Sequence, residues 1–226
     1  MERDWCGELV SYIRGADRVA ANALISDWAE RSSYESAVVE LMAPALELFG
    51  KLWADNAGDT SLAQGYVAAK VAEDLLSKVL ALRETSGLPP APAKGPVVVG
   101  NIEDDFHPLG RKMLVAFLRC DGWKVEDLGV DVSPGAFVDS AQEVGARVVG
   151  ASAMMFSTAK NVKRLREEVD RRGLRGRLQI AAGGAVFRLR PELVVEFGAD
   201  GTSPTALQAP ALFQELWARS VRLFPG

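Results

Sequence analysis

Two hydrophobic periods divide the chain into a helical part and a part in which short strands alternate with helices. Apolar residues recur every three or four positions at 33–52 and again at 61–82, so each stretch would present one apolar helix face. Four or five helices of this size predict a small bundle. Pro44 lies inside the first stretch, and we expect it to kink or break the helix there.

The pattern changes at residue 97, where short β-rich runs begin. The predicted strands lie at 97–102, 124–128, 148–152, 179–182 and near Asp200. The helical patterns between and after them lie at 109–121, 135–145, 158–172, 190–197 and 205–219. This alternation predicts a flavodoxin-like or Rossmann-like fold, a doubly wound sheet of five parallel strands. Ligands of such sheets bind beyond the carboxyl ends of the strands.

A proline-rich stretch separates the two parts. Residues 86–96 contain four prolines, which cannot continue a helix and which favour an extended chain. We therefore predict a helical domain at 1–87, a semi-rigid linker at 88–96 and an α/β domain at 97–226.

Composition and charge narrow the classes of function. The 226 residues are 48% hydrophobic and 25% charged, and the net charge of −4 argues against a strongly basic nucleic-acid binder. The stretch 160–177 has eight lysines and arginines, but acidic residues interleave with them as on a solvated helix face. No apolar run reaches about 18 residues, so no membrane span is predicted. Two distant cysteines and a charged N-terminus predict a reducing, cytoplasmic compartment.

Candidate chemistry follows the first predicted strand, where the single histidine, His107, stands two residues after Asp105. The sequence has no P-loop and no HExxH zinc motif. A carboxylate that accepts a hydrogen bond from one imidazole nitrogen fixes the tautomer and leaves the other nitrogen free to bind a metal. Gly110 would allow close approach of the backbone at the start of the next helix. The ordinary alternative is a loop histidine capped by a neighbouring aspartate.

Motifs at the ends of the third and fourth predicted strands favour a more specific interpretation. Forty-one residues separate Gly110 from a Ser-x-Met motif, and a further twenty-eight separate that motif from a Gly-Gly pair. The full set is Asp105-x-His107-x-x-Gly110, Ser152-x-Met154 and Gly183-Gly184. This pattern resembles the fingerprint of the cobalamin-binding family, D-x-H-x-x-G, S-x-L and G-G, and the resemblance covers residues 97–217.

The resemblance implies that cobalamin binds with its own base displaced from the cobalt. His107 would be the lower axial ligand to cobalt, and Asp105 would be its hydrogen-bond partner. Ser152 would hydrogen-bond within the pocket of the nucleotide tail. Gly183 and Gly184 would leave room for that tail, because a Cβ at either position would collide with it.

Three positions depart from the family pattern. Met154 replaces the leucine of S-x-L, which is a volume-conserving exchange. Asp104 stands where many members have glycine, and Pro108 stands where methyl carriers often have aspartate. These departures leave corrin binding as the expectation, but they weaken an assignment to the best-known methyltransferase subgroup.

The helical part resembles, more loosely, the bundle that precedes the Rossmann-like domain in methionine synthase and in methyltransferase corrinoid proteins. The resemblance implies a helical cap over the upper face of the corrin, with Trp53 and Tyr66 as candidate contacts. The alternative is that such residues belong to the core of the bundle. Cobalamin photoreceptors have a Glu-His pair where this chain has Gly65-Tyr66, which argues against light sensing through adenosylcobalamin.

The function that the resemblance implies is that of a corrinoid methyl carrier. Its cofactor would be methylcobalamin or hydroxocobalamin, and its partners would be methyltransferases, with no nucleic acid and no membrane. Such a protein is a component of a methyltransferase system and is not a complete enzyme alone. Two alternatives stay open. One is a cobalamin sensor, storage or delivery protein without methyl transfer, and the other is a flavodoxin-like domain that binds another ligand or none.

Overall fold

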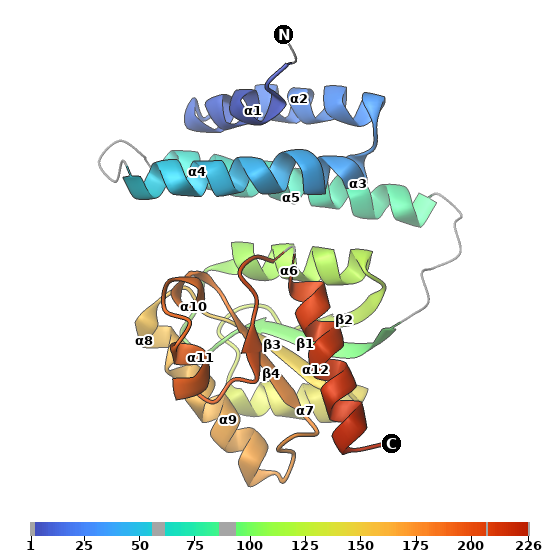
Figure 1. Ribbon diagram of the computed structural model, residues 1–226, viewed down its shortest axis with the longest axis vertical. Coiled ribbons are helices and arrows are strands. Elements are labelled where there is room, and N and C mark those ends of the chain that lie inside the picture. Colours follow the sequence, from blue (N-terminus) through green and yellow to red (C-terminus); the bar gives the residue numbers. More distant parts are fainter. Residues whose placement is uncertain (1–2, 56–61, 86–93, 207, 226) are drawn as a thin grey trace. The chain divides into compact units, whose positions relative to one another are not determined.

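The computed structural model describes residues 3–55, 62–85, 94–206 and 208–225 (Figure 1). The chain divides into two compact units, Met1–Leu88 and Pro89–Gly226. Most of the predicted linker, 88–93, lies outside the described residues. Its last three residues belong to the first strand, which begins at Lys94. Each unit is described separately below.

The first unit is helical. Its elements are α1 (Trp5–Arg14), α2 (Arg18–Arg31), α3 (Tyr34–Ser36), the π-helical segment η1 (Ala37–Met42), α4 (Ala43–Asp55) and α5 (Leu62–Thr85). The side chains of Asp4 and Asp17 cap α1 and α2, because each accepts a hydrogen bond from a backbone N–H of the first turn. The apolar faces of the helices form the core of the unit, which includes Leu9, Ile13, Leu41, Val71 and Val79.

The break that we predicted at Pro44 takes the form of a π-helical segment. The chain stays helical from Tyr34 to Asp55, but the N–H of Ala43 donates to the carbonyl of Val38, five residues earlier. Proline has no N–H, and its ring crowds the carbonyl four residues before it. A wider turn before Pro44 accommodates both effects, so the helix continues through the proline.

The second unit is a parallel sheet with helices on both faces. Its strands are β1 (Lys94–Asn101), β2 (Trp123–Asp127), β3 (Val148–Ser152), β4 (Gln179–Gly183) and β5 (Gly201–Thr202). Its helices are α6 (Pro108–Cys120), α7 (Pro134–Val144), α8 (Phe156–Ala159), α9 (Asn161–Arg171), α10 (Ala185–Leu189), α11 (Leu193–Glu196) and α12 (Ala209–Leu223). The strand order is β2-β1-β3-β4-β5, and every pairing is parallel. The predicted fold class is confirmed.

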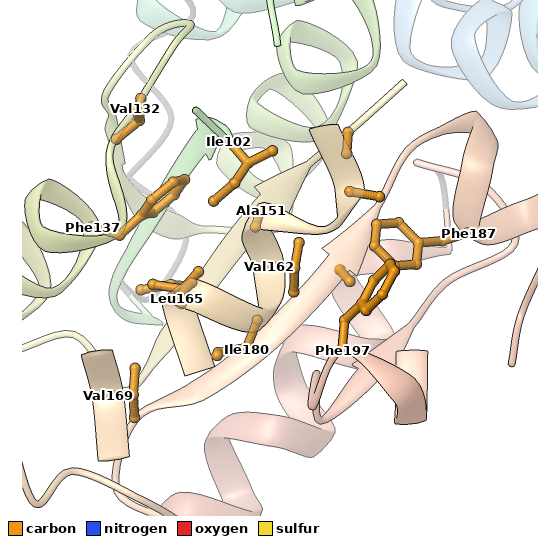
Figure 2. Close-up of a cluster of buried hydrophobic side chains, with 14 of the residues drawn as sticks. Ile102, Val132, Phe137, Ala151, Val162, Leu165, Val169, Ile180, Phe187 and Phe197 are labelled. Atoms are coloured by element: carbon orange, nitrogen blue, oxygen red, sulfur yellow. The ribbon is translucent and has the colours of Figure 1, made fainter. Parts of the chain in front are cut away.

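Alternate residues of the buried strands point to two separate cores. On one face Val97, Val99 and Val148 pack with residues of α6 and α12, among them Leu118 and Phe213. On the other face the strands pack against α7, α9, α10 and α11; Figure 2 shows this cluster, with members such as Ile102, Phe137, Leu165, Ile180 and Phe187. Helix layers on both faces leave the ends of the strands as the exposed part of the sheet.

One predicted helix is divided in the structure, and one short helix was not predicted. The pattern at 158–172 becomes α8 and α9, which are separated at Lys160. The pattern at 190–197 corresponds to α11 alone, and α10 lies wholly before it. Pro191 follows the last turn of α10, where proline disfavours helical backbone in the residue before it. A helix as short as α10 has too few residues to show a helical period in the sequence.

The charged face of α9 is internally paired. Glu168 accepts hydrogen bonds from the guanidinium groups of Arg171 and Arg172, which lower its pKa to about 2. Asp170 pairs with Arg175, and Arg172 also pairs with Asp139 of α7. These pairs fit the predicted solvated helix face. In the part of the chain that the structure describes, no helix combines the length and the apolar composition that crossing a bilayer requires.

Candidate functional site

The carboxyl ends of β1 and β3 adjoin where the strand order reverses. Chain connections run to opposite sides of this point, which leaves a crevice where doubly wound folds bind ligands. Asn101 at the end of β1 is in register with Ser152 of β3, and Ser152 is in register with Gly183 of β4. Three strands therefore end at one level, and each ends on a polar residue or a glycine.

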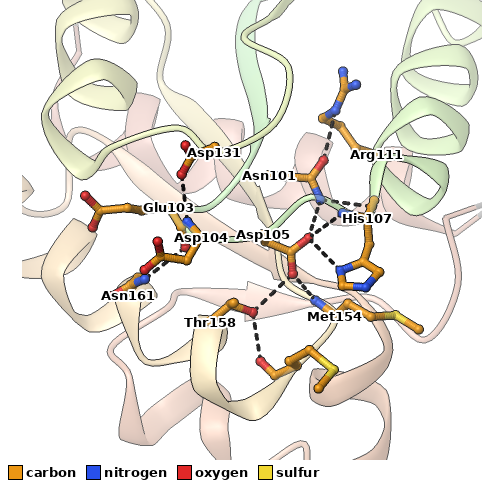
Figure 3. A network of polar contacts seen from close by, with 11 residues as sticks. Asn101, Glu103, Asp104, Asp105, His107, Arg111, Asp131, Met154, Thr158 and Asn161 are labelled. Carbon is orange, nitrogen blue, oxygen red and sulfur yellow. Dashed lines mark hydrogen bonds and ion pairs between the residues drawn. The ribbon is translucent and has the colours of Figure 1, made fainter.

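Asp105 is fully buried in the turn that follows β1, and its carboxylate accepts four hydrogen bonds (Figure 3). Its Oδ1 accepts from the Asn101 amide at 2.9 Å and from the backbone N–H of His107 at 3.0 Å. Its Oδ2 accepts from the backbone N–H of Met154 at 2.6 Å and from the Thr158 hydroxyl at 3.1 Å. The carboxylate thus connects the turn after β1 to the segment after β3.

These contacts set the charge of Asp105. Burial by itself raises the pKa of this carboxyl group, because the charged form loses its water. The hydrogen bonds from Met154, His107, Thr158 and Asn101 stabilise the charged form and outweigh burial. The net pKa of Asp105 lies below its ordinary value, so the group is a carboxylate at neutral pH.

His107 is the last residue before α6 and presents its imidazole at this edge of the sheet. The Nδ1 atom lies 3.4 Å from Oδ1 of Asp105, and the side chain is 55% exposed although its partner is buried. A carboxylate facing Nδ1 favours the tautomer with the proton on Nδ1, which leaves a lone pair on Nε2. The geometry therefore provides one exposed nitrogen ligand with a fixed partner.

A single ligand of this kind fits a metal that brings its other ligands with it. In the described part of the chain, no group of three or more histidine, cysteine, aspartate and glutamate side chains is arranged to hold a metal ion. Protein-built sites for transition metals use three or four such donors. A metal already held in a macrocycle needs only an axial ligand, which is what His107 offers.

Beside His107, the first turn of α6 and the ends of β3 and β4 form a cradle, which we define as Gly110, Ser152 and Gly183. A Cβ added to Gly183 would meet no atom within 4 Å, and one added to Gly110 would meet only the Ser152 hydroxyl, at 3.9 Å. Ser152 is 7% exposed, and no described residue hydrogen-bonds to its hydroxyl, which is not among the fully enclosed side-chain atoms that lack a partner. Open space beside a hydroxyl that is available to a ligand fits a polar group of a bound cofactor.

Gly184 is needed by the fold of the chain itself. Its φ is +108°, and a Cβ there would overlap the backbone carbonyl of Ala153. The fold of the chain itself therefore requires glycine at this position, whether or not a tail is bound. Of the two glycines, only Gly183 has open space where a Cβ would lie.

Met154 contributes through its backbone and exposes its side chain. Its N–H makes the shortest of the four bonds to Asp105, while the thioether chain is 47% exposed. An exposed, flexible apolar side chain at the carboxyl edge of the sheet suits contact with a flat apolar ligand. Its exposure also explains why the exchange of leucine for methionine needs no repacking of the core.

Thr158 and Asn101 belong to the site and were missed in the sequence. Thr158 is buried within the short helix α8, and no motif marks it, because threonine is common where helices begin. Asn101 carried a recognisable signal, since it is a polar residue at the end of an otherwise apolar, buried strand. A buried polar side chain at that position must find hydrogen-bond partners, and the partners of Asn101 are residues of the site.

The two departures near His107 have simple structural explanations. Asp104 has a φ of +67°, a left-handed conformation in which glycine costs least, and its N–H donates to a carboxylate oxygen of Asp131 at 2.8 Å. Pro108 occupies the first helical position of α6, where a missing N–H costs nothing. Neither residue takes part in the contacts of Asp105.

The two candidates of the helical unit are described only in part. Tyr66 lies on α5 and is 61% exposed, with the Lys70 ammonium 5.8 Å from the centre of its ring. It is therefore not a core residue of the bundle. Trp53 falls within α4, but its side chain lies outside the described part of the structure.

Comparison with known proteins agrees with this geometry. The family model "B12 binding domain" matches residues 95–211. A corrinoid protein of Desulfitobacterium hafniense is 33% identical over 177 residues, which is 76% of this chain and 77% of that protein. Trimethylamine corrinoid protein 1 of Methanosarcina mazei is 36% identical over 91 residues, 40% of this chain and 42% of that protein.

Solved structures share the fold. The monomethylamine corrinoid protein of Methanosarcina barkeri superposes with a TM-score of 0.73 and 21% identity, over 92% of this chain and 96% of that chain. The methanol:cobalamin methyltransferase complex of Methanosarcina barkeri gives a TM-score of 0.52 with 20% identity, over 96% of this chain and 81% of that chain. The match to the family model confirms cobalamin as the cofactor predicted from the sequence, and the chain belongs to the B12-binding domain family of corrinoid proteins.

Proposed function

We propose that this chain binds cobalamin base-off/His-on, with His107 as the lower axial ligand, and carries a methyl group between partner methyltransferases in the cytoplasm. The observation that carries the proposal is the pairing of an exposed imidazole with a buried carboxylate, 3.4 Å apart, at the switch point of the sheet. Corrinoid proteins of methylamine systems are among the relatives, which supports the methyl-transfer role.

Bound cobalamin would supply a cobalt centre that accepts and donates a methyl group. The residues of this chain hold and tune that centre. Asp105 would orient the imidazole and keep the proton on Nδ1, leaving the lone pair of Nε2 on His107 available to hold the metal. The cradle would hold the nucleotide tail, with the hydroxyl of Ser152 as its hydrogen-bonding group, and the exposed side chain of Met154 would hold the corrin.

We also propose roles for the parts that lie outside the α/β domain. Residues 1–87 would serve as a helical cap, with Trp53 and Tyr66 facing the upper side of the corrin, and residues 88–96 as the linker that lets the cap move. The exposure of Tyr66 supports this, because the ring is free to contact a ligand rather than the core of the bundle. Movement of the cap would be needed because each partner enzyme must reach the cobalt for methyl transfer.

The first test asks whether the protein retains cobalamin and whether a methyl group is transferred to the bound cobalt. Purified apo-protein is mixed with hydroxocobalamin and gel-filtered, and the bound corrinoid is then reduced and offered a methyl donor with candidate methyltransferases. Methylation of the bound cobalt is the expected result. Retention without transfer to or from any methyltransferase encoded near it would favour the sensor, storage or delivery alternative. If the corrinoid elutes separately from folded protein, the proposal that this chain binds cobalamin is contradicted.

A further inference from the structure

A second polar network lies behind the pair of Asp105 and His107, and its centre is Asn101. This side chain is fully buried, and its amide nitrogen donates to Oδ1 of Asp105 at 2.9 Å and to the backbone carbonyl of His107 at 3.0 Å. Its amide oxygen accepts from Nε of Arg111 at 3.0 Å. Because a guanidinium group only donates, the amide oxygen must face Arg111 and the nitrogen must face the ligand pair.

Arg111 is the next member of the network. It follows Gly110 in the first turns of α6, and it is 6% exposed (Figure 3). Besides Asn101 it contacts the carboxylate of Asp127 at the end of β2. Asp127 also accepts a hydrogen bond from the backbone N–H of Gly129. The network therefore runs from the end of β2 through α6 to the turn that holds His107.

The arrangement keeps a cation near Asp105 without letting it bind there. An arginine in direct contact would form a bidentate ion pair with the carboxylate and would compete with the imidazole for Oδ1. Here the Asn101 amide stands between them, and Asp127 offsets the positive charge. A charged donor on the amide oxygen polarises the amide, which strengthens its two N–H donors toward Asp105 and His107.

We infer that Asn101 and Arg111 are positioning residues for the metal ligand: they fix the carboxylate and the backbone of His107 so that Nδ1 keeps its proton and Nε2 presents its lone pair. The inference rests on the proposed role of His107. The 3.4 Å between Nδ1 and Oδ1 is longer than an ordinary hydrogen bond of about 2.9 Å. The residues that hold Asp105 and His107 in place therefore decide whether this distance shortens to that of a hydrogen bond.

The test uses the fact that His107 is the only histidine of the chain. Apo-protein labelled with nitrogen-15 histidine gives one pair of imidazole nitrogen signals, and their chemical shifts in the neutral ring report the tautomer. The variants are Asn101→Leu, which keeps the size of the side chain but makes no hydrogen bond, and Arg111→Met. The matched control is Arg119→Met, which removes an exposed arginine of α6 whose hydrogen bond within the described residues goes to the carbonyl of Val125.

We expect the ratio of the Nδ1–H to the Nε2–H tautomer to fall about threefold or more in both variants and to stay unchanged in Arg119→Met. Loss of tautomer control with retained circular dichroism would separate positioning from folding. If Asn101→Leu does not fold, Arg111→Met decides alone, and Arg111→Lys, which keeps the charge beside Asp127, should restore part of the ratio. An unchanged ratio in folded Arg111→Met would overturn the inference.

The same variants loaded with cobalamin separate this inference from the proposed function. We expect a smaller fraction of cobalt(II) with a histidine nitrogen bound in Asn101→Leu and Arg111→Met than in the control. If no histidine nitrogen binds cobalt in the parent protein, the proposed function fails, while the tautomer ratio still judges the two positioning residues. If histidine binds normally in all variants and the ratio does not change, only the inference fails.

Discussion

Asp105 has a structural role and a ligand-orienting role in the same four hydrogen bonds. Two of its donors belong to the segment after β3, so the carboxylate holds the ends of two strands together before any cofactor is present. The same contacts lower its pKa. A buried group of this kind makes the stability of the domain depend on pH as well as on ligand.

The first prediction concerns Asp105→Asn. The variant places an amide where two oxygens accept from donors, so we expect about 1–3 kcal/mol less free energy of unfolding at pH 7. In the parent protein the folded pKa is depressed, so the stability due to this group is full above the ordinary aspartate pKa of about 4 and is lost as pH falls through the lower folded value. Urea unfolding between pH 3 and 7 checks both effects. An equally steep acid dependence in the variant would contradict this role for Asp105.

The Gly-Gly pair gives a second prediction, because the two glycines differ in what surrounds them. Gly183→Ala places its Cβ in open space, so the apo-protein should unfold within about 0.5 kcal/mol of the parent while cobalamin retention falls. Gly184→Ala should destabilise the apo-protein by more than about 1 kcal/mol, because its backbone is left-handed and Ala153 blocks the Cβ. Thermal unfolding and gel filtration of both variants measure this contrast. Equal retention by Gly183→Ala would remove Gly183 from the cofactor site.

Asp104 gives a third prediction at the same scale. Replacement by glycine relieves a left-handed backbone and keeps the N–H that donates to Asp131. We expect Asp104→Gly to be neutral or to stabilise the protein by up to about 1 kcal/mol, with cobalamin binding unchanged. Calorimetry of the apo-protein is the measurement. A clear loss of binding would mean that the Asp104 carboxylate takes part in cofactor recognition.

The residues of the site were predictable where they follow a fixed spacing and unpredictable where only the fold brings them together. Asp105, His107 and Ser152 stand at strand ends that the hydrophobic pattern located within one or two residues. Thr158 reaches Asp105 across 53 positions of sequence, and no local pattern indicates such a contact. The conformation of Gly184 could not be predicted either, because motif spacing alone does not distinguish a glycine required by the backbone from one required by a ligand.

At the scale of elements, strands were easier to locate than short helices. The buried strands read as continuous apolar runs bounded by polar or glycine residues, and β3 begins and ends where it was predicted. The start of β1 was predicted too late because Pro96 suggested linker. Residues 94–97 pair only with β2, and pairing with β3 begins at Val98, so the proline lies where the sheet has a neighbour on one side only.

Helix α5 gives a fourth prediction, through Tyr66. The exposed ring contributes little to the core, so Tyr66→Ala should leave the thermal unfolding of the apo-protein within about 0.5 kcal/mol of the parent. If the helical domain caps the corrin, cyanide should reach the upper side of the bound cobalt faster in this variant and at the parent rate in Tyr66→Phe. Stopped-flow absorbance of the loaded proteins measures that rate. Identical rates in all three would remove Tyr66 from the cap.

At the scale of the whole molecule, the two compact units divide the proposed work. Every residue proposed for the lower side of the cofactor lies in the second unit, and both candidates for the upper side lie in the first. Alternating periods of hydrophobicity were enough to predict the fold class, a helical part followed by a parallel α/β part. The hydrophobic pattern carries no information about how the two units would act on one cofactor. That depends on surface residues, which the pattern does not indicate.

The division gives a fifth prediction. A fragment that begins at Pro89 contains the whole second unit with both of its apolar cores, so it should fold and retain cobalamin. The upper side of its cobalt should be open, and we expect it to bind cyanide faster than the full chain does. Circular dichroism and gel filtration test the first expectation, and absorbance kinetics test the second. A fragment that folds but releases cobalamin would assign part of the affinity to the helical unit.

The measurement that tests the central claim most directly is electron paramagnetic resonance of the cobalt(II) form in protein labelled with nitrogen-15 histidine. His107 is the only histidine, so a twofold splitting from nitrogen-15 can arise from this residue alone, whereas the base of cobalamin gives the threefold splitting of nitrogen-14. We predict the twofold splitting in the parent protein and its loss in His107→Ala. A threefold splitting, or no nitrogen splitting at all, in folded protein that retains the corrinoid would contradict His107 as the ligand to cobalt.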